Sequence, residues 1–573
     1  MRQKLLSLAK KNYHKNLNKK NSLLWAIFFN ILFLLPYLAF GQIRHGSLDD
    51  YFMSSVLTGA YGSTYNVHLY FINAVYGYFL WPFYHFFPTV GWYFIFELLG
   101  TFFSFTAITY SLIEKVEGKV GKSLSIFVLA ALTPDFYFQL SFTQCATVYT
   151  AAGILLVCNS DSKKKWLYAL VGILFLIAGS VMRYEGFLLG VPFLVLSLFQ
   201  QYFKSHKFHL STAITICIAI ASIYGLRTFD KNLYNNDNYR YYAEFQPIRA
   251  YFGDGSFYDD EATYDELEER DMNGIDFQFA KSWMFYDTRV LSIDSLQEIK
   301  KIAQNNLYEP NFKRLPMAFF LAISNAFTRT NGWCWALLCI LLIFSSSKQA
   351  NMYPWISLTF IALSLGYLLW INRLVYHVES GVWLYAITSS IPFMDKSFFN
   401  SRVLLKLEKI FPKFIFSLTL FFSIWGVYTQ PILKQTFSLI ETPQMPDDWR
   451  SFVLYATKHP NDVFLLSFNR YKQLGEFKDP AYQAVKPGSW QNIFSWGYWN
   501  IYLPEMTKEL SYRGIQNPIC DITHSNVYTL EDNNKPSLQP FYTKHYHKDL
   551  QVDTAKVFGS LMLLKYYIQE ENK

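Results

Sequence analysis

The chain has 573 residues, of which 52% are hydrophobic, 19% are aromatic and only 16% are charged. An average soluble domain contains roughly 25% charged residues, so this composition excludes a soluble globular enzyme and predicts a membrane protein. The formal charge of +8 does not indicate nucleic-acid binding, because the basic residues form short clusters between apolar blocks. That distribution is typical of membrane topology.

A hydrocarbon core of about 30 Å requires roughly 20 apolar residues in a helix. Eleven spans are predicted on this basis, at residues 21–40, 91–113, 123–138, 144–158, 166–182, 187–203, 210–226, 333–344, 353–371, 382–394 and 411–428. Residues 1–20 carry seven Lys or Arg and no acidic residue, which predicts a cytoplasmic basic tail. With an odd number of spans, the C-terminus is then extracytoplasmic, and the chain is expected in the plasma (inner) membrane.

Three outer segments follow from this topology: a first loop at residues 41–90, a long loop at 227–314, and a polar C-terminal part at 430–573. Residues 68–87 are apolar but interrupted by Pro, Gly, Asn and His and rich in aromatic residues, so they are predicted to lie flat in the headgroup layer. Residues 315–327 are interpreted in the same way, with an extension of the next span as the alternative. The fold class is therefore a mainly α, polytopic membrane protein (domain 21–429) with a small α/β extracytoplasmic C-terminal domain.

Two carboxylates, Asp49 and Asp50, open the first outer loop. A carboxylate at this level is well placed to take the proton from an acceptor hydroxyl while a sugar leaves a lipid phosphate. The alternative is structural, because the sequence from Ser47 to Asp50 also fits a capping box at a helix start. Both interpretations stay open, since one aspartate can cap while the other reacts.

Two further groups of charged residues lie at the predicted outer ends of spans. Arg183 and Arg373 are candidates for binding phosphate oxygens and stabilising a departing phosphate, with interfacial anchoring as the alternative for each. Four residues are assigned supporting roles: Glu185, His377, Glu379 and His68, which opens the flat aromatic segment. If Arg373 and His377 lie on one helix, they share a face.

Other features favour structural interpretations. The acidic residues between positions 259 and 271 predict a solvated helical face rather than a metal site, and Trp490, Trp496 and Trp499 are predicted core residues rather than sugar-stacking platforms. The sequence has no P-loop, Rossmann glycine signature, HExxH or nucleophile elbow, so a cytoplasmic nucleotide-sugar enzyme is not expected.

The order of these features resembles the GT-C superfamily of integral membrane glycosyltransferases, which includes protein mannosyltransferases and aminoarabinose transferases. The resemblance covers residues 1–201: one span, an outer loop with the pair Asp49-Asp50, a flat segment that begins at His68, and a fifth span that ends at Arg183. The segments 49–53 and 91–93 are also similar to a poorly characterised group of bacterial multi-spanning envelope proteins. In place of the superfamily's His-Pro-Pro this chain has His68-Leu69-Tyr70, and Gln144 stands near the expected second-turn acid.

The resemblance implies a polyprenyl-phosphate sugar donor, a first-loop acid that serves as base, and a possible divalent metal. The sequence-based hypothesis is a hexosyl- or pentosyltransferase that inverts the anomeric centre and acts on a glycan, lipid or protein acceptor of the cell envelope. A flippase or transporter of lipid-linked saccharides, or a non-catalytic envelope assembly factor, is the alternative. A transporter would favour paired hydropathy repeats and ionisable residues in mid-span.

Overall fold

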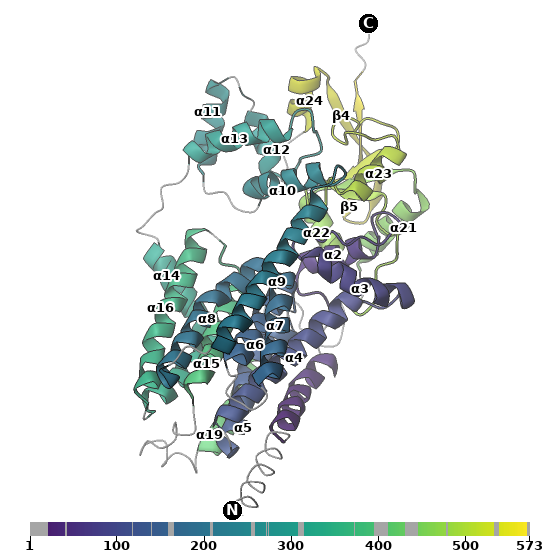
Figure 1. Ribbon diagram of the computed structural model, residues 1–573. Coiled ribbons are helices and arrows are strands. Elements are labelled where there is room, and N and C mark those ends of the chain that lie inside the picture. Colours follow the sequence, from purple (N-terminus) through teal and green to yellow (C-terminus); the bar gives the residue numbers. More distant parts are fainter. Residues whose placement is uncertain are drawn as a thin grey trace, which may run out of the picture.

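A computed structural model describes residues 21–39, 43–116, 118–138, 140–158, 165–206, 210–253, 258–270, 272, 274–306, 315–345, 347–371, 373–394, 411–429, 445–476, 480–531 and 538–569. The predicted basic tail at 1–20 lies outside these residues. A bundle of apolar helices forms one end of the described molecule, and a mixed sheet with short helices forms the other (Figure 1). The predicted fold class, mainly α with a small α/β C-terminal part, is confirmed.

Each of the eleven predicted spans coincides with a helix. The bounds are Asn21–Ala39, α4 (Trp92–Val116), α5 (Gly118–Tyr137), α6 (Phe142–Cys158), α7 (Lys165–Met182), α8 (Tyr184–Ser205), α9 (Leu210–Tyr234), α15 (Thr330–Ile343), α16 (Lys348–Trp370), α17 (Tyr376–Ser389, followed by a 3₁₀ turn at Ile391–Phe393) and α19 (Phe411–Tyr428). By length and hydropathy alone, five of the described helices can cross a bilayer: Asn21–Ala39, α4, α8, α9 and α16.

Helix α14 (Leu315–Phe327) precedes α15 and is separated from it by a break of two residues. The two helices meet at 86°. Residues 315–327 therefore do not extend the next span as one tilted helix, which was the alternative interpretation of this segment.

Helix α6 is the centre of the bundle, and all 17 of its residues are buried. It packs against α4, α7, α8 and α17. Small residues permit this close approach: a Cβ added to Gly153 on α6 would lie 2.9 Å from the carbonyl oxygen of Gly172 on α7. Because helices gain little from the hydrophobic effect inside a bilayer, such close packing of small residues is what associates them.

The first outer loop contains α2 (Leu48–Leu57) and α3 (Ala74–Phe86). The 13 residues of α3 are fewer than the roughly 20 that a span needs. Its aromatic side chains Tyr78, Phe79 and Trp81 are half exposed, as expected for a helix in the interfacial layer. In Figure 1, α3 lies beside α2 near the upper end of α4.

The described residues of the long loop contain the helices α10 (Arg240–Gly253), α11 (Asp260–Glu269), α12 (Gly274–Lys281) and α13 (Ile293–Asn305). The acidic stretch is largely α11, which begins at the N-cap Asp259. Most of its carboxylates are exposed or half-exposed, in agreement with the predicted solvated face. Of the predicted stretch, Asp271 lies outside the described residues.

The C-terminal part contains a five-stranded mixed sheet in the order β2-β1-β3-β5-β4. Its elements are α21 (Asp447–Lys458), β1 (Val463–Leu466), α22 (Phe468–Glu476), β2 (Ile493–Ser495), α23 (Pro504–Tyr512), β3 (Val527–Leu530), α24 (Leu538–Tyr546), β4 (Leu550–Phe558) and β5 (Leu561–Ile568). Strand β1 pairs in parallel with β2 and β3, and β5 pairs antiparallel with β3 and β4.

The C-terminal part is docked on the first outer loop. Backbone hydrogen bonds join Trp490 N to Ala60 O at 2.8 Å and Gly91 N to Tyr482 O at 2.7 Å. The ring of Tyr471 stacks on Phe52 of α2, with 4.6 Å between the ring centroids. The sheet and the first loop therefore form one unit at the same end of the bundle.

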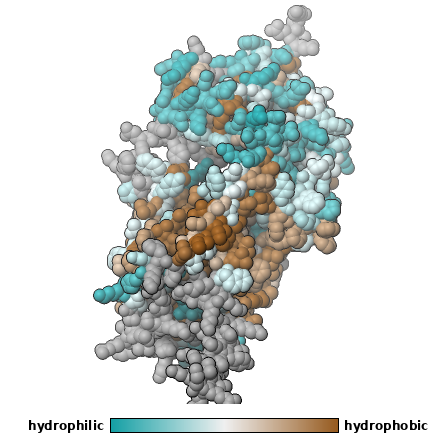
Figure 2. Space-filling model, viewed as in Figure 1, coloured by the Kyte–Doolittle hydropathy of each residue, from teal (hydrophilic) through white to brown (hydrophobic). Residues whose placement is uncertain are grey.

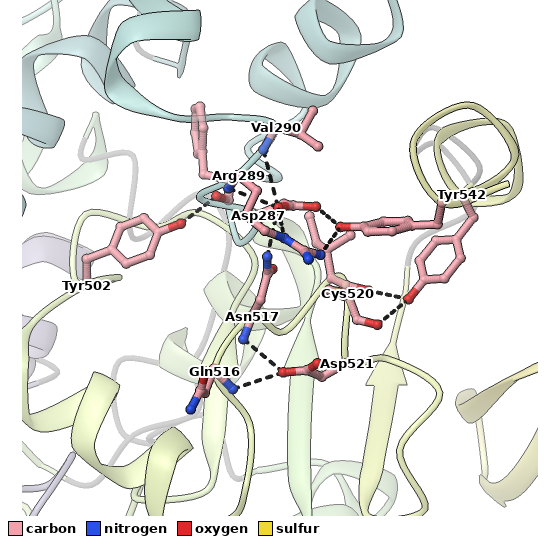
Figure 3. Close-up of polar contacts among 12 residues, drawn as sticks. Asp287, Arg289, Val290, Tyr502, Gln516, Asn517, Cys520, Asp521 and Tyr542 are labelled. Carbon is pink, nitrogen blue, oxygen red and sulfur yellow. Dashed lines mark hydrogen bonds and ion pairs between the residues drawn. The ribbon is translucent and has the colours of Figure 1, made fainter. Parts of the chain in front are cut away.

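The long loop is joined to the same unit through the buried carboxylate of Asp287 (Figure 3). Asn517 donates to its Oδ1 at 2.8 Å, and the hydroxyl of Tyr546 donates to its Oδ2. Arg289 donates in turn to the Tyr546 hydroxyl at 3.2 Å. The described parts of the first loop, the long loop and the C-terminal part are thus assembled at one end of the bundle, and Figure 2 shows this hydrophilic cap over a hydrophobic band.

Candidate functional site

A cavity of about 1410 Å³ lies where the bundle meets the outer segments. Helices α8, α9 and α16 supply its lower walls, and α10 supplies part of its upper wall. The lining positions on α9 recur at intervals of three and four residues, which is one face of a helix: 223, 226, 227, 230, 231 and 234. The cavity is therefore a space between packed helix faces at the level where the apolar spans end.

The lining changes from apolar to cationic along the spans. Leu188, Leu189 and Pro192 of α8 lie deeper in the bundle than Arg183, which precedes that helix. On α16, which also lines the cavity, Leu368 and Ile371 lie at the end of the helix, just before Arg373. Such a cavity suits an amphiphile whose chain lies among apolar side chains and whose anionic head contacts the arginines.

Arg183 and Arg373, predicted separately from sequence, line this same cavity. The Arg183 Nη1 donates to Thr143 Oγ1 at 2.7 Å, and its guanidinium carbon lies 4.9 Å from the centroid of the Phe142 ring. Its side chain is 27% exposed, so the group is held in place yet reachable from the cavity. Arg373 is exposed.

The side chain of Asp50 is fully buried. Its Oδ1 accepts from the Tyr93 hydroxyl at 2.7 Å and from Phe142 N at 3.0 Å, and its Oδ2 accepts from Ser47 Oγ at 2.6 Å. Asp50 N in turn donates to Ser47 Oγ at 3.2 Å. Ser47 therefore caps α2 as its N-cap residue, and the Asp50 carboxylate joins α2 to α4 and α6.

Burial raises the pKa of Asp50 to about 6, against an ordinary value near 3.8, and the three hydrogen bonds only partly oppose that rise. Removal of a carboxylate from water disfavours its charged form. A fully buried group with three donors around it cannot reach an incoming hydroxyl, so the geometry favours a structural role for Asp50.

Asp49 occupies a different environment, because its side chain is half-buried. Its Oδ1 accepts from the Tyr498 hydroxyl at 2.6 Å and from the Trp499 indole Nε1 at 3.0 Å. Both donors come from the C-terminal part, 449 and 450 residues further along the chain. The predicted burial of Trp496 and Trp499 is confirmed, since each is only 1% exposed.

The start of α6 brings the acidic pair and the arginines together. Phe142 N donates to the Asp50 carboxylate, and the neighbouring Thr143 accepts from Arg183. The electrostatic neighbours of the Arg183 guanidinium are Glu185, Asp49, Arg373 and Asp50. Asp50 and Arg183 thus contact the start of α6, and Asp49 and Arg373 are electrostatic neighbours of Arg183 there.

The supporting residues divide into two groups. Glu185 lines the cavity, 4.0 Å from Arg183, and His377 is an electrostatic neighbour of Arg183. Glu379 instead lies 3.9 Å from Arg329. It belongs to a separate polar cluster in which Tyr376 donates to the buried carboxylate of Asp135 at 2.6 Å.

Arg373 and His377 do not share a helix face, contrary to the conditional expectation from their spacing. Helix α17 begins only at Tyr376, and Val375 is its N-cap. Arg373 lies before the helix and donates its backbone N–H to Leu368 O at 2.8 Å. The position of Arg373 is therefore set by the end of α16 rather than by α17.

His68 lies beside the cavity rather than in its lining. Its ring stacks on Tyr239 with centroids 3.7 Å apart, and its Nδ1 lies 2.8 Å from Asn66 Oδ1. Burial lowers the pKa of His68 from 6.5 to about 4, so the imidazole is neutral near pH 7. A neutral, stacked ring points to a role in ordering the first loop.

This lowered pKa predicts a pH dependence of stability. Because the folded state binds a proton less readily than the unfolded state, the His68 contribution is present above pH 6.5 and is lost as the pH falls toward 4. After allowance for partial exposure, we expect His68 to contribute about 2 kcal/mol less to the free energy of unfolding at pH 4 than at pH 7. Thermal unfolding of the wild type and of His68→Phe in detergent, measured across this range, checks it: identical pH profiles for the two proteins would contradict the assignment.

Sequence reasoning missed two sets of residues. Arg227 and Lys231 line the cavity because α9 continues to Tyr234, eight residues beyond the predicted end of that span. The helical spacing of Leu226, Asp230 and Tyr234 was the available signal. No local pattern indicated that Tyr498 and Trp499 would contact Asp49.

A divalent metal requires several oxygen, nitrogen or sulfur ligands at one point. Over the residues that the structure describes, no group of three or more His, Cys, Asp or Glu side chains is placed to hold one. The carboxylate of Asp50 is already occupied by three donors. The described residues therefore do not fit a divalent metal ion.

No protein-family model matches the sequence, and no curated protein matches it. Among solved structures, the chain is similar to ArnT from Cupriavidus metallidurans in the apo state, with a TM-score of 0.38 and 10% identity over 94% of this chain and 97% of the other. It is also similar to the archaeal oligosaccharyltransferase AglB from Archaeoglobus fulgidus, in complex with an inhibitory peptide and a dolichol-phosphate, with a TM-score of 0.37 and 10% identity over 91% and 70% of the two chains.

Proposed function

We propose that this chain is a membrane glycosyltransferase that moves a sugar from a polyprenyl-phosphate donor to a glycan, lipid or protein acceptor of the cell envelope. The observation that carries the proposal is the shared cavity, in which Arg183 and Arg373 lie at the end of an apolar lining. Asp49 is an electrostatic neighbour of Arg183. A lipid chain fits the apolar walls, and its phosphate fits the arginines.

In this reaction the carboxylate of Asp49 accepts the proton of the acceptor hydroxyl. The hydroxyl oxygen forms a bond to the anomeric carbon as the bond from that carbon to the phosphate oxygen breaks. The phosphate leaves with the bonding electron pair, and its growing charge is stabilised by Arg183 and Arg373. A single displacement of this kind inverts the anomeric centre.

The other assignments are supporting ones. Tyr498 and Trp499 position Asp49 through their hydrogen bonds to its Oδ1, and Glu185 and His377 adjust the field around Arg183. The proposed site is extracytoplasmic, with the N-terminus on the cytoplasmic side of the plasma membrane, because the charge clusters follow that orientation.

Arg183→Gln and Arg373→Gln are each expected to weaken binding of a polyprenyl phosphate by about 10- to 100-fold, the effect of losing a charge-assisted hydrogen bond of about 1.5–3 kcal/mol. Binding of farnesyl phosphate to the purified full-length protein measures this. Arg450→Gln on α21, exposed and paired with Asp447 at 3.1 Å, is the matched control and should bind as the wild type does. Unchanged binding in both cavity variants would refute the phosphate site.

An assay of sugar transfer distinguishes an enzyme from a flippase or an assembly factor. Lipids extracted from a deletion strain should contain an accumulated lipid-linked sugar, identified by mass spectrometry. The purified protein should release that sugar onto an acceptor fraction. A flippase would bind the same lipid but leave its glycosidic bond intact.

A further inference from the structure

The first outer loop contains a strained turn in the wall of the cavity. Tyr70 has a φ of +59°, and Phe71 N donates to Leu69 O at 2.7 Å. A hydrogen bond that spans one residue, with a positive φ at that residue, defines the rare and strained form of the γ-turn. Because every side chain except that of glycine disfavours such a backbone, the surroundings of Tyr70 must hold it there.

Contacts from two other parts of the chain hold this turn. The hydroxyl of Tyr234, at the end of α9, accepts from Tyr70 N at 2.8 Å. The ring of Tyr70 stacks on that of Trp499, with the ring centroids 6.4 Å apart and an angle of 16° between the planes. Strained residues that are held in this way concentrate at active sites and ligand clamps. The strain therefore points to a function for the Tyr70 side chain.

The turn presents two aromatic rings to the cavity. Tyr70 and Phe71 both line the cavity and are half-buried, whereas Leu69 and Ile72 on either side of them are at most 1% exposed. The Tyr70 and Phe71 rings together form an aromatic wall. Glycine at position 70 would relieve the strain, but it would also remove half of this wall.

The aromatic wall extends from the proposed phosphate site to the proposed base. The centroid of the Phe71 ring lies 5.9 Å from that of Phe142, and the Phe142 ring contacts the Arg183 guanidinium at 4.9 Å. The Phe71 centroid also lies 5.5 Å from that of Trp499, whose Nε1 donates to Asp49. In the proposed displacement the sugar lies between the phosphate and the base, which places it along the aromatic wall.

We infer that the aromatic wall is the subsite for the transferred sugar, and that Tyr70 and Phe71 determine specificity for it. The inference rests on the proposed function and adds recognition of the sugar ring. The face of an aromatic ring carries partial negative charge, and the C–H groups of a sugar ring carry partial positive charge. The ligand is therefore a sugar with one face of C–H groups, which packs on the wall while its hydroxyl groups point away from it.

Core packing is the competing explanation, because the Tyr70 ring also contacts Phe71, Tyr242 and Trp499. If the wall only supports the fold, loss of a ring disturbs the whole cavity, and a lipid phosphate binds less tightly whether or not it carries a sugar. If the wall binds the sugar, only the lipid that carries the sugar is affected. The decisive measurement therefore compares one lipid with and without its sugar.

The experiment measures binding of two ligands to the purified full-length protein: the lipid-linked sugar that accumulates in the deletion strain, and the same lipid after mild acid has removed its sugar. Tyr70→Leu and Phe71→Leu are each expected to weaken binding of the lipid-linked sugar by about tenfold, the size of one favourable stacking contact. Binding of the sugar-free lipid should change by less than about threefold. Tyr70→Phe keeps the ring and should retain the binding of both lipids, as should the control Phe86→Leu on the exposed side of α3.

Equal weakening of both lipids by the two leucine variants overturns the inference, and so does unchanged binding of the lipid-linked sugar. If Tyr70→Leu does not fold, as judged by thermal unfolding, Tyr70→Gly replaces it with the same expected loss, because glycine adopts a positive φ without strain. The proposed function fails separately if neither lipid binds to the wild type or if no sugar is transferred. A wild type that binds and transfers the sugar, with leucine variants that do the same, refutes only the sugar subsite.

Discussion

Asp49→Asn is expected to lower the rate of sugar transfer by about 10²- to 10⁴-fold, the usual contribution of a general base. The amide keeps an oxygen that can accept from Tyr498 and Trp499, which hold Asp49 at 2.6 and 3.0 Å. The fold should therefore survive. Only the ability to accept a proton from the acceptor hydroxyl is lost.

The measurement is transfer by purified protein, with the lipid-linked sugar from the deletion strain as donor. Glu244→Gln is the control, because Glu244 is an exposed carboxylate of the same cavity that has no part in the proposed chemistry. Donor binding by Asp49→Asn should remain near that of the wild type, so the loss appears in kcat. Activity within threefold of the wild type would remove Asp49 from the mechanism.

Much of the bundle could be predicted from sequence because a span must be apolar over the thickness of the bilayer. The predicted span at 166–182 differs by one residue from α7 (Lys165–Met182). The end of α9 could not be predicted in this way, since the rule ends a span where charges begin. Arg227, Asp230 and Lys231 continue the helix because they face a cavity instead of lipid.

The candidate site was only partly predictable for a similar reason. Sequence position suggested that Asp49, Arg183 and Arg373 lie on one side of the membrane, but only the packing at the start of α6 makes them neighbours. The contacts of Tyr498 and Trp499 with Asp49 depend on docking of the C-terminal part on the first loop. Contacts across some 450 residues leave no local pattern.

The choice between Asp49 and Asp50 also required the structure. The capping-box pattern indicates that a carboxylate near Ser47 has a structural role. The pattern alone does not show whether that carboxylate also accepts the proton of the acceptor hydroxyl. Full burial of Asp50 and the contact of Phe142 N with its carboxylate make that choice.

Asp50→Ala is expected to destabilise the protein by about 3 kcal/mol, because the half-buried Ser47 donor and the buried Tyr93 and Phe142 donors lose their acceptor. Asp50→Asn is the matched variant. Its amide oxygen can still accept from Tyr93 and Phe142, and its amide nitrogen can donate to Ser47 Oγ. We expect Asp50→Asn to cost less than about 1 kcal/mol near pH 7 and to retain sugar transfer, unlike Asp49→Asn.

The pH dependence of the free energy of unfolding tests the role of Asp50 more directly than a stability measured at one pH. Its pKa of about 6 in the folded protein lies above the ordinary value of 3.8, so between these values the folded state holds a proton that the unfolded state has released. The free energy of unfolding therefore falls as the pH rises from about 4 to 6, by up to about 3 kcal/mol at about 1.4 kcal/mol per pH unit. His68 contributes an opposite slope of about 2 kcal/mol over nearly the same range, so these two groups together are expected to lower the wild-type free energy of unfolding by only about 1 kcal/mol. Asp50→Asn removes only the falling part, so its stability should rise with pH between 4 and 6; a profile parallel to that of the wild type would show that Asp50 does not titrate in this range.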